Sequence, residues 1–200
     1  PEAGAHEPLL MILRRPTVAM AVIALVVSQV VMVAIMTMTP LLMDDHGHEL
    51  GAVGLVISAH TRGMVALSPV SGRITVSVGP LRAILLAAAV LAIAAGLAGL
   101  APVDGPLLGL ALFLLGYGWN LAFVAGSALL MSGVEHAERT RTEGATDTLV
   151  WSSSAVASLG SGVVVAAVGF GALGLLGLLL LAVGVAAILR LQVSPLPAPS

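Results

Sequence analysis

Long apolar runs, separated by short polar or proline- and glycine-rich stretches, take up most of the chain. The hydrocarbon core of a bilayer is about 30 Å thick, and about 20 mostly apolar residues cross it as an α-helix. Runs of this length cover residues 17–39, 51–72, 81–101, 107–132, 146–168 and 172–189. The pattern therefore predicts an all-α, polytopic membrane protein in which residues 1–200 form a single membrane domain of six transmembrane helices.

Prolines and glycines set the expected ends of these helices, because proline interrupts a helix and glycine favours a turn. Pro40 is expected to close the first span, and Pro80 to precede the third. The turn at residues 169–171 predicts that the last two spans form a short antiparallel hairpin. Residues 192–200 contain three prolines and are expected to form a disordered tail.

The arginines predict an orientation. Short cytoplasmic loops collect Lys and Arg, whereas acidic residues carry little topological weight. Seven of the eight basic residues flank the spans on one side of the membrane: Arg14, Arg15, Arg73, Arg82, Arg139, Arg141 and Arg190. The N and C termini are therefore both expected in the cytoplasm.

Composition supports this picture and excludes other classes. With 58% apolar residues, 9% charged residues and a mean hydropathy of +1.10, the chain has too little polar surface for a soluble enzyme fold. The net charge of −2 and the absence of lysine exclude a cationic surface for nucleic acid. The absence of cysteine excludes disulfides and thiolate metal sites.

The eighth arginine, Arg62, lies inside the second span together with His60. Charged side chains near the bilayer centre are costly and are therefore functional candidates. Two residues along a helix rotate a side chain by about 200°, so Arg62 and His60 cannot share one site. The neighbours on each face favour Arg62 as the side chain in a water-filled cavity. The alternatives are that Arg62 only caps carbonyl groups and that His60 is a packing residue rather than a proton carrier.

A polar stripe runs along the fifth span. Its members are spaced by four, three, four and three residues, which places them on one helical face: Asp147, Trp151, Ser154, Ser158 and Ser161. This face is either a helix contact or the wall of a water-accessible cavity. Asp147 is a candidate proton carrier, with stabilisation of the helix N-terminus as the alternative. Thr140 and Glu143 have capping-box spacing and are predicted to begin this helix, a structural role.

Aromatic side chains surround an amide in the fourth span. Phe113, Tyr117 and Asn120 share one face, and Trp119 and Phe123 share a neighbouring one. Four rings around a mid-membrane Asn favour a binding pocket, with ordinary aromatic packing as the alternative.

The first span presents Gln29, Met32, Met36 and Thr39 on one face. Methionine adapts to varied shapes, so this face is a candidate to accept unlike ligands. The commoner use of methionine is to fill gaps in a core.

No cofactor or metal site is predicted. The acidic residues and histidines between the first two spans lie in one short segment, which we interpret as a solvated loop: Asp44, Asp45, His46, His48 and Glu49. An intramembrane serine hydrolase is an unfavoured alternative, with Ser161 as nucleophile and His60 as base. Packing of small residues explains the Gly-Ser-Gly sequence around Ser161 fully.

The spans, the termini and the segment between spans two and three resemble one half of a major facilitator superfamily (MFS) transporter, more specifically its C-terminal half. The family's loop motif has a Gly, three variable residues, Asp-Arg, a variable residue, Gly and then Arg or Lys. Here the segment from Gly72 to Pro80 reads GRITVSVGP, in which Gly72 and Gly79 match. Val76, Ser77 and Pro80 replace the acid and both bases, so the charge relay of the motif is expected to be absent or supplied elsewhere.

The resemblance implies a secondary active transporter rather than an enzyme, with spans one, two, four and five near a central cavity. The polar residues described above lie on those same spans. We expect proton-coupled export of a small organic molecule by alternating access, in a bacterial cytoplasmic (plasma) membrane. The apolar, aromatic and Met-rich cavity is the reason for expecting export.

Because the chain begins at Pro1 and not at Met, we expect a fragment. Its expected partners are the lipid bilayer, the substrate, protons, and an N-terminal six-helix half or a second copy. The alternative is a non-transporting membrane subunit that pairs with another six-helix chain.

Overall fold

The structure, a computed structural model, describes residues 7–103 and 106–193, and nearly all of them are helical. Within these ranges the chain has no strand. The helices in order are α1 (Leu9–Arg14), α2 (Pro16–Asp45), α3 (Leu50–Val65), α4 (Ser68–Val78), α5 (Pro80–Leu100), α6 (Pro106–Ser132), the 3₁₀ turn η1 (His136–Glu138), α7 (Arg139–Val168) and α8 (Gly171–Val193).

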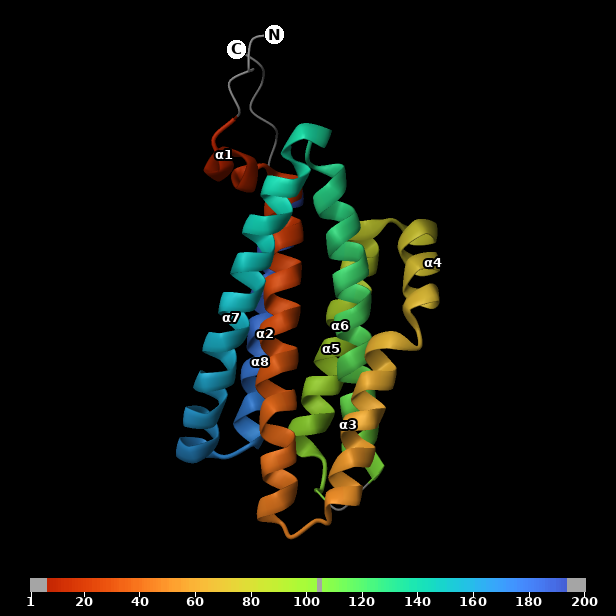
Figure 1. Cartoon of the computed structure of the whole chain (residues 1–200), viewed down its shortest axis with the longest axis vertical. Helices are drawn as coiled ribbons and strands as arrows, with labels where there is room; N and C mark the ends of the chain where they lie inside the picture. Colours follow the sequence, from red (N-terminus) through yellow and green to blue (C-terminus); the bar gives the residue numbers. More distant parts are fainter. Residues whose placement is uncertain (1–6, 104–105, 194–200) are drawn as a thin grey trace.

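Six helical segments of the described chain are long and apolar enough to cross a membrane. The second is formed by α3 and α4 together, and the fifth by η1 and α7. The prediction of an all-α protein with six transmembrane helices is thereby confirmed. Successive segments run in opposite directions (Figure 1), so six of the seven flanking arginines lie near the end of the bundle where α2 begins, and Arg73 lies in the middle of α4, which runs toward that end. The assignment of this end to the cytoplasm stays a prediction.

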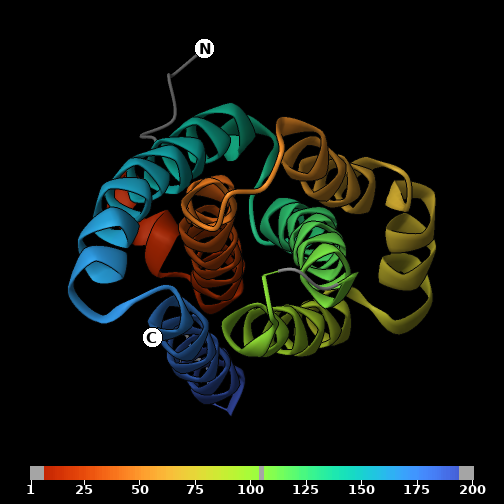
Figure 2. The same ribbon diagram turned by 90° about the horizontal axis from the view of Figure 1, so that it is seen from below.

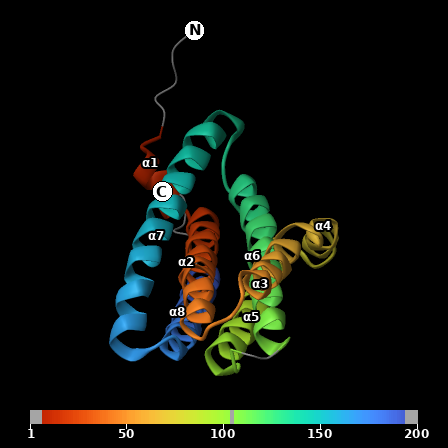
Figure 3. The same cartoon turned by 60° about the horizontal axis from the view of Figure 1, so that its bottom comes forward.

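Helices α2 and α6 form the centre of the bundle (Figure 2). On one side α7 packs along α2 and α3 packs along α6, and on the other side α8 packs along α2 and α5 along α6. Figure 3 shows that α4 lies at the edge of the bundle beside α3, far from α7. The short helix α1, which the sequence analysis did not predict, contacts α7.

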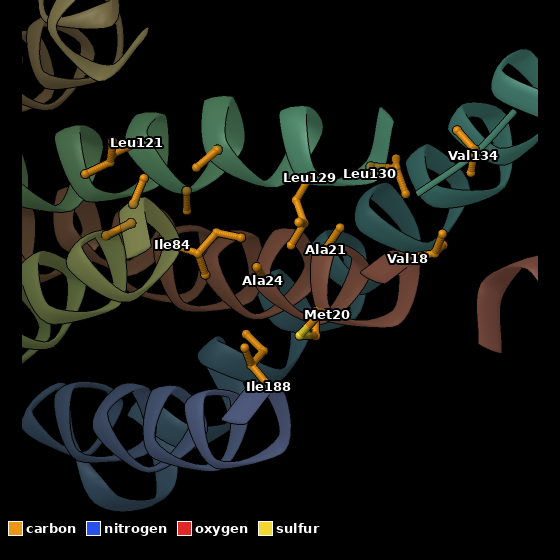
Figure 4. Packing of buried hydrophobic residues seen from close by; sticks show 14 of the residues in the cluster. Val18, Met20, Ala21, Ala24, Ile84, Leu121, Leu129, Leu130, Val134 and Ile188 are labelled. Atoms are coloured by element: carbon orange, nitrogen blue, oxygen red, sulfur yellow. The ribbon is translucent and has the colours of Figure 1, made fainter. Parts of the chain in front are cut away.

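Small and branched apolar side chains fill the space between these helices. Near the arginine-bearing end, Val18 and Ala21 of α2 belong to one buried cluster with Ile84 of α5, Leu121 of α6 and Ile188 of α8 (Figure 4). Lipid tails are as apolar as these side chains, so close packing, rather than removal from water, stabilises the contacts between the helices.

The close contact between α3 and α6 depends on two glycines. A Cβ atom added at Gly63 would collide with the carbonyl oxygen of Phe113, and one added at Gly116 with the carbonyl oxygen of His60. The two backbones therefore approach each other with no room for a side chain, as in membrane helix pairs built on small residues. This contact fixes the rotation of α3 and so decides which of its polar side chains face α6.

The prediction that Pro40 closes the first span is wrong, because α2 continues through it to Asp45. Proline removes one backbone N–H, and membrane helices tolerate this loss where Ser and Thr side chains bond nearby carbonyl groups. The neighbouring Thr39 hydroxyl donates to the carbonyl oxygen of Ile35 at 2.8 Å, one residue before the Met36 carbonyl group that Pro40 leaves without a donor.

The second span is not one continuous helix but breaks between Val65 and Ser68. Pro69 lies in the first turn of α4, where backbone N–H groups have no acceptor within the helix, so the lack of an N–H costs nothing there. The Ser68 hydroxyl donates to the Val65 carbonyl oxygen at 2.9 Å. In a continuous helix this oxygen would accept from the N–H of residue 69, which Pro69 lacks. Figure 1 shows the result, with α4 displaced sideways from the line of α3.

The helix of the fifth span, α7, starts at Arg139, next to the helix start predicted at Thr140 and before the predicted membrane span of residues 146–168. Thr140 and Glu143 lie inside this helix, so the prediction that they form its capping box is wrong. The early start places Asp147 more than two turns from the helix N-terminus.

Charged residues hold the loop between α6 and α7 at the arginine-bearing end. The N–H of Glu135 donates to Glu138 Oε2 at 3.2 Å, and these two residues form the capping box. Arg15, which precedes α2, donates to both carboxylate oxygens of Glu138 at 2.7 and 3.0 Å and also pairs with Glu7. The bonds to Glu138, and then those to Glu7, raise the pKa of Arg15. The start of α2 is thereby tied to the start of α7.

At the other end, Gly169 turns the chain between α7 and α8 with a φ of +86°, which fits the predicted hairpin. Gln192 and Val193 are the last residues of α8. The rest of the predicted tail, residues 194–200, lies outside the described residues, as do residues 104–105 of the turn before α6.

Candidate functional site

A cavity of about 230 Å³ opens between α2, α6 and α7. Gln29 lines it from α2, Trp119 and Phe123 from α6, and Asp147 and Trp151 from α7. The last turns of α6 also line it, so the cavity lies in the part of the bundle nearer the arginine-bearing end. Gln29, Trp119 and Asp147, which the sequence predicts for the transport pathway, are thus brought together.

A chain of hydrogen bonds forms one side of this cavity. Trp119 Nε1 donates to Gln29 Oε1 at 2.6 Å, and Gln29 Nε2 donates to Ser154 Oγ at 2.9 Å. Ser154 in turn donates to the carbonyl oxygen of Val150 at 3.0 Å. Because three helices contribute to this chain, it holds the rotations of α2, α6 and α7 in register at the site.

Aromatic rings form a second part of the lining, and Trp119 belongs to both parts. Trp119 and Phe123 stack with ring centroids 5.3 Å apart and an interplanar angle of 22°. Trp151 lines the cavity from α7 and is 67% exposed, a large fraction for an indole. The rings give the site an apolar surface that fits a flat or aliphatic organic group.

Two carboxylates from one face of α7 complete the lining, Glu143 and Asp147. Neither has an ion-pair partner within the part of the chain that the structure describes. Stabilisation of a helix N-terminus is confined to its first turn, so it does not explain Asp147 at the ninth position of α7.

Thr146, between these acids in sequence, also lines the cavity and is 1% exposed. Its hydroxyl has no hydrogen-bond partner among the described residues. A buried hydroxyl without a partner is costly, and this one belongs to a residue of the cavity lining.

Asn120 lies elsewhere, at the break between α3 and α4. It accepts a hydrogen bond from Ser71 Oγ at 2.6 Å and donates to Ser68 Oγ at 3.1 Å. The predicted pocket of four aromatic rings around Asn120 is therefore not formed, because Trp119 is rotated by about 100° from Asn120 and faces α2. The amide holds the first turn of α4 against α6 instead. Tyr117 is half-buried and does not line the cavity.

His60 and Arg62 face different surroundings, as the helical spacing predicts. His60 is 3% exposed, and its Nδ1 lies 3.0 Å from the carbonyl oxygen of Leu112, which fits the packing alternative. Arg62 is exposed on α3, and within the described ranges it bonds to no carbonyl group. The role of Arg62 in a pathway stays a prediction.

The polar stripe of α7 divides along its length. Asp147 and Trp151 line the cavity, and Ser154 bonds to Gln29 at its edge. Further along, Ser161 is buried and donates to the carbonyl oxygen of Ser158 at 2.7 Å, while Ser158 itself is half-buried. Ser161 and His60 each hydrogen-bond to a backbone carbonyl group and not to each other, so the nucleophile and base of a hydrolase are not assembled.

The methionine face of the first span packs into the core. Met32 is buried in an apolar cluster, and Met36 packs against it, so the gap-filling interpretation holds for both. Of that face, Gln29 alone reaches the cavity. Of the two loop-motif glycines, Gly79 ends α4 with a φ of +87°, which favours glycine, and Gly72 lies within α4.

Sequence reasoning did not assign Glu143, Thr146 or Phe123 to one cavity. Glu143 precedes Asp147 by four residues, and this i, i+4 spacing on α7 was the available signal. The signal was not used because Glu143 also fitted a capping box.

Comparison with known proteins gives a family match to the Major Facilitator Superfamily over residues 2–158. The chain is 42% identical over 154 residues to the uncharacterized MFS-type transporter YdeG of Bacillus subtilis, and 40% identical over 145 residues to YddS of the same organism. It is 33% identical over 156 residues to the riboflavin transporter RfnT of Brucella anthropi.

These alignments cover 76%, 72% and 78% of the chain but 36%, 33% and 39% of the relatives. The matched part of the chain thus spans between 33% and 39% of the length of these curated relatives. No solved structure matches the chain.

Proposed function

Because the chain belongs to the major facilitator superfamily, by its match over residues 2–158, we propose that it forms the C-terminal six-helix half of a secondary active transporter. In this assignment α2, the pair α3 and α4, α6 and α7 correspond to transporter helices seven, eight, ten and eleven. Two such halves rock about a site near the membrane midplane, and each presents one side of that site. The other half, or a second copy of this chain, closes the cavity. The bacterial relatives support a bacterial cytoplasmic membrane as its location.

The observation that carries this proposal is the cavity between α2, α6 and α7. A transport site needs polar groups inside a bundle that is otherwise apolar, and ionisable groups within membrane-spanning segments mark substrate and ion pathways. Three of the four helices assigned to the pathway line this cavity, and α5 and α8 do not.

Asp147 carries the coupling proton in this proposal. It lines the cavity, has no ion-pair partner among the described residues, and lies beyond the turn that the helix dipole stabilises. It is therefore able to take up and release a proton without breaking a salt bridge. Arg62, exposed at mid-span on α3, is a second pathway group that meets the other half.

The transported molecule is a small organic compound, and the direction is export. The support is the mixed lining of stacked rings and aliphatic side chains, which suits an apolar molecule. Methionine does not add to this argument, since Met32 and Met36 pack in the core. Riboflavin, named for the Brucella anthropi relative, belongs in the first substrate screen.

The test is substrate-dependent proton movement in proteoliposomes, with this chain alone compared with this chain joined to an upstream six-helix half. We expect proton movement in the joined protein alone, because alternating access needs both sides of the site. Activity of the chain by itself would indicate a homodimeric carrier. Activity in neither preparation would contradict transport and favour the alternative of a non-transporting membrane subunit.

A further inference from the structure

We infer that the cavity between α2, α6 and α7 binds an organic cation with an aromatic or aliphatic body, and that Glu143 is one of its binding residues. This inference rests on the proposed transport function and names its substrate class. It goes beyond the assignment of Asp147 to a proton, because it concerns what the rest of the lining recognises.

The first argument is the hydrogen-bonding capacity that the lining leaves unused. Trp119 and Ser154 each bond to Gln29, and Ser154 also donates to the carbonyl oxygen of Val150. The polar groups of the lining that form no bond to another described residue are the carboxylates of Glu143 and Asp147, the hydroxyls of Ser127 and Thr146, and the second N–H of the Gln29 amide. The two carboxylates are the charged members of this set, so the free polar surface of the cavity is acidic, which a positively charged ligand complements.

The second argument is charge. Glu143 and Asp147 are four residues apart on one helical face, a spacing at which like charges repel. The lining contains no Arg, Lys or His in the part of the chain that the structure describes. A cation between the two carboxylates relieves this repulsion and supplies the missing counter-charge.

The third argument is the buried Thr146 hydroxyl. It is 1% exposed, lines the same cavity and has no partner within the described residues. The hydroxyl oxygen itself is shielded by its neighbours, so a ligand group reaches it only after a small shift of the lining. Binding with that shift would remove the cost of an unsatisfied buried group.

The fourth argument is the aromatic lining. The faces of Trp and Phe rings attract cations, and Trp is the strongest of the aromatic side chains in this respect. Trp119 and Phe123 line the cavity from α6 as a stacked pair, and Trp151, 67% exposed, lines it from α7. Pockets for drug-sized ligands measure about 300–1,000 Å³, so the cavity of about 230 Å³ fits a small cation or one end of a larger one.

The chain supplies its own probe for this site. It contains two tryptophans, Trp119 and Trp151, and both line the cavity. Intrinsic tryptophan fluorescence of the reconstituted chain therefore reports on this cavity alone. The probe ligands are phenyltrimethylammonium, neutral benzyl alcohol and anionic benzenesulfonate, which share one phenyl ring and differ in charge.

We expect a saturable fluorescence change with phenyltrimethylammonium, and at least about tenfold weaker responses to the neutral and anionic compounds. Glu143→Gln keeps the side-chain shape and removes the charge, so the Kd for the cation should rise about tenfold. The matched control is Asp45→Asn, which removes an exposed acid at the opposite end of α2 and should leave the Kd unchanged.

An equal response to benzenesulfonate or benzyl alcohol would overturn the cation class, and an unchanged Kd in Glu143→Gln would remove Glu143 from the site. No response to the cation would also overturn the inference. These outcomes differ from failure of the transport proposal, which is measured as proton movement in the joined protein. Proton movement without cation binding would refute the substrate class alone.

Discussion

Polar residues that line the cavity differ in whether other residues of the chain already form hydrogen bonds or ion pairs with them. Gln29 and Ser154 are buried and hydrogen-bonded, and their partners lie on other helices. Asp147 lines the same space without an ion-pair partner in the described ranges. The first kind of residue shapes the site, and the second kind is free to act on a proton or a ligand.

Replacing Asp147 tests the coupling proton. Asp147→Asn removes the titrating group but keeps the side-chain shape, so substrate movement should become independent of the pH gradient. The measurement is substrate flux in proteoliposomes, made with the complete transporter with and without an imposed gradient. If the variant kept its dependence on the gradient, the proton would bind elsewhere.

Replacing Arg62 tests whether this exposed arginine belongs to the pathway. Arg62→Ala in the complete transporter should abolish transport and leave membrane insertion intact, because the side chain bonds to no described group whose loss would disturb folding. Thr61→Ala, at the exposed neighbouring position, is the matched control. Unaltered flux in Arg62→Ala would remove Arg62 from the mechanism.

At the level of helices, the contact between α3 and α6 shows how the polar residues of the second span are sorted. Gly63 and Gly116 bring the two backbones together, and this orientation turns His60 toward the Leu112 carbonyl group. The same rotation leaves Arg62 on the surface of α3. Asn120 then holds α4, the other half of this broken span, through Ser68 and Ser71.

Gly116→Ala tests this contact. The added methyl group would collide with the His60 carbonyl oxygen and lie 3.0 Å from the Met64 nitrogen, and neither backbone atom moves easily. Overpacking of this kind costs about 1–3 kcal/mol, so thermal unfolding in detergent should occur at a lower temperature. Gly109→Ala in the same helix has open space around its Cβ and serves as the control. Equal unfolding temperatures for the two variants would contradict the close contact.

At the level of the whole molecule, the arginine-bearing end is held together by charge as well as by packing. Arg15 joins the start of α2 to Glu138, 123 residues later, and both groups are partly shielded from water. The two helices connected in this way form two walls of the cavity. Their relative position at this end therefore affects the opening of the site.

Glu138→Gln should lower the free energy of unfolding by about 1 kcal/mol, the upper range for exposed ion pairs, because the bond to Arg15 is bidentate. The difference from the parent chain should shrink at high salt, since ions screen the pair. A salt-independent loss of stability would indicate a packing effect instead.

Much of the fold could be predicted from the sequence, and the predictions that were wrong failed for local reasons. Apolar length predicts six spans because the thickness of a bilayer fixes how many residues must cross it. Pro40 and Pro69 show the limit of this reasoning, since the first lies inside a continuous helix and the second follows a break. Whether a proline interrupts a helix depends on its position in the turn and on nearby hydroxyl groups.

The sequence by itself determined the helical class, the approximate spans and most of the polar candidates, because each depends on neighbours along one helix. The tertiary structure decided which of these candidates meet. Trp119 is 90 residues and Ser154 is 125 residues from Gln29, yet both bond to it. Asn120, one residue after Trp119, belongs to another network. The reason is physical: each helix presents its residues about 100° apart, and packing between helices fixes the rotation that brings one of them to a site.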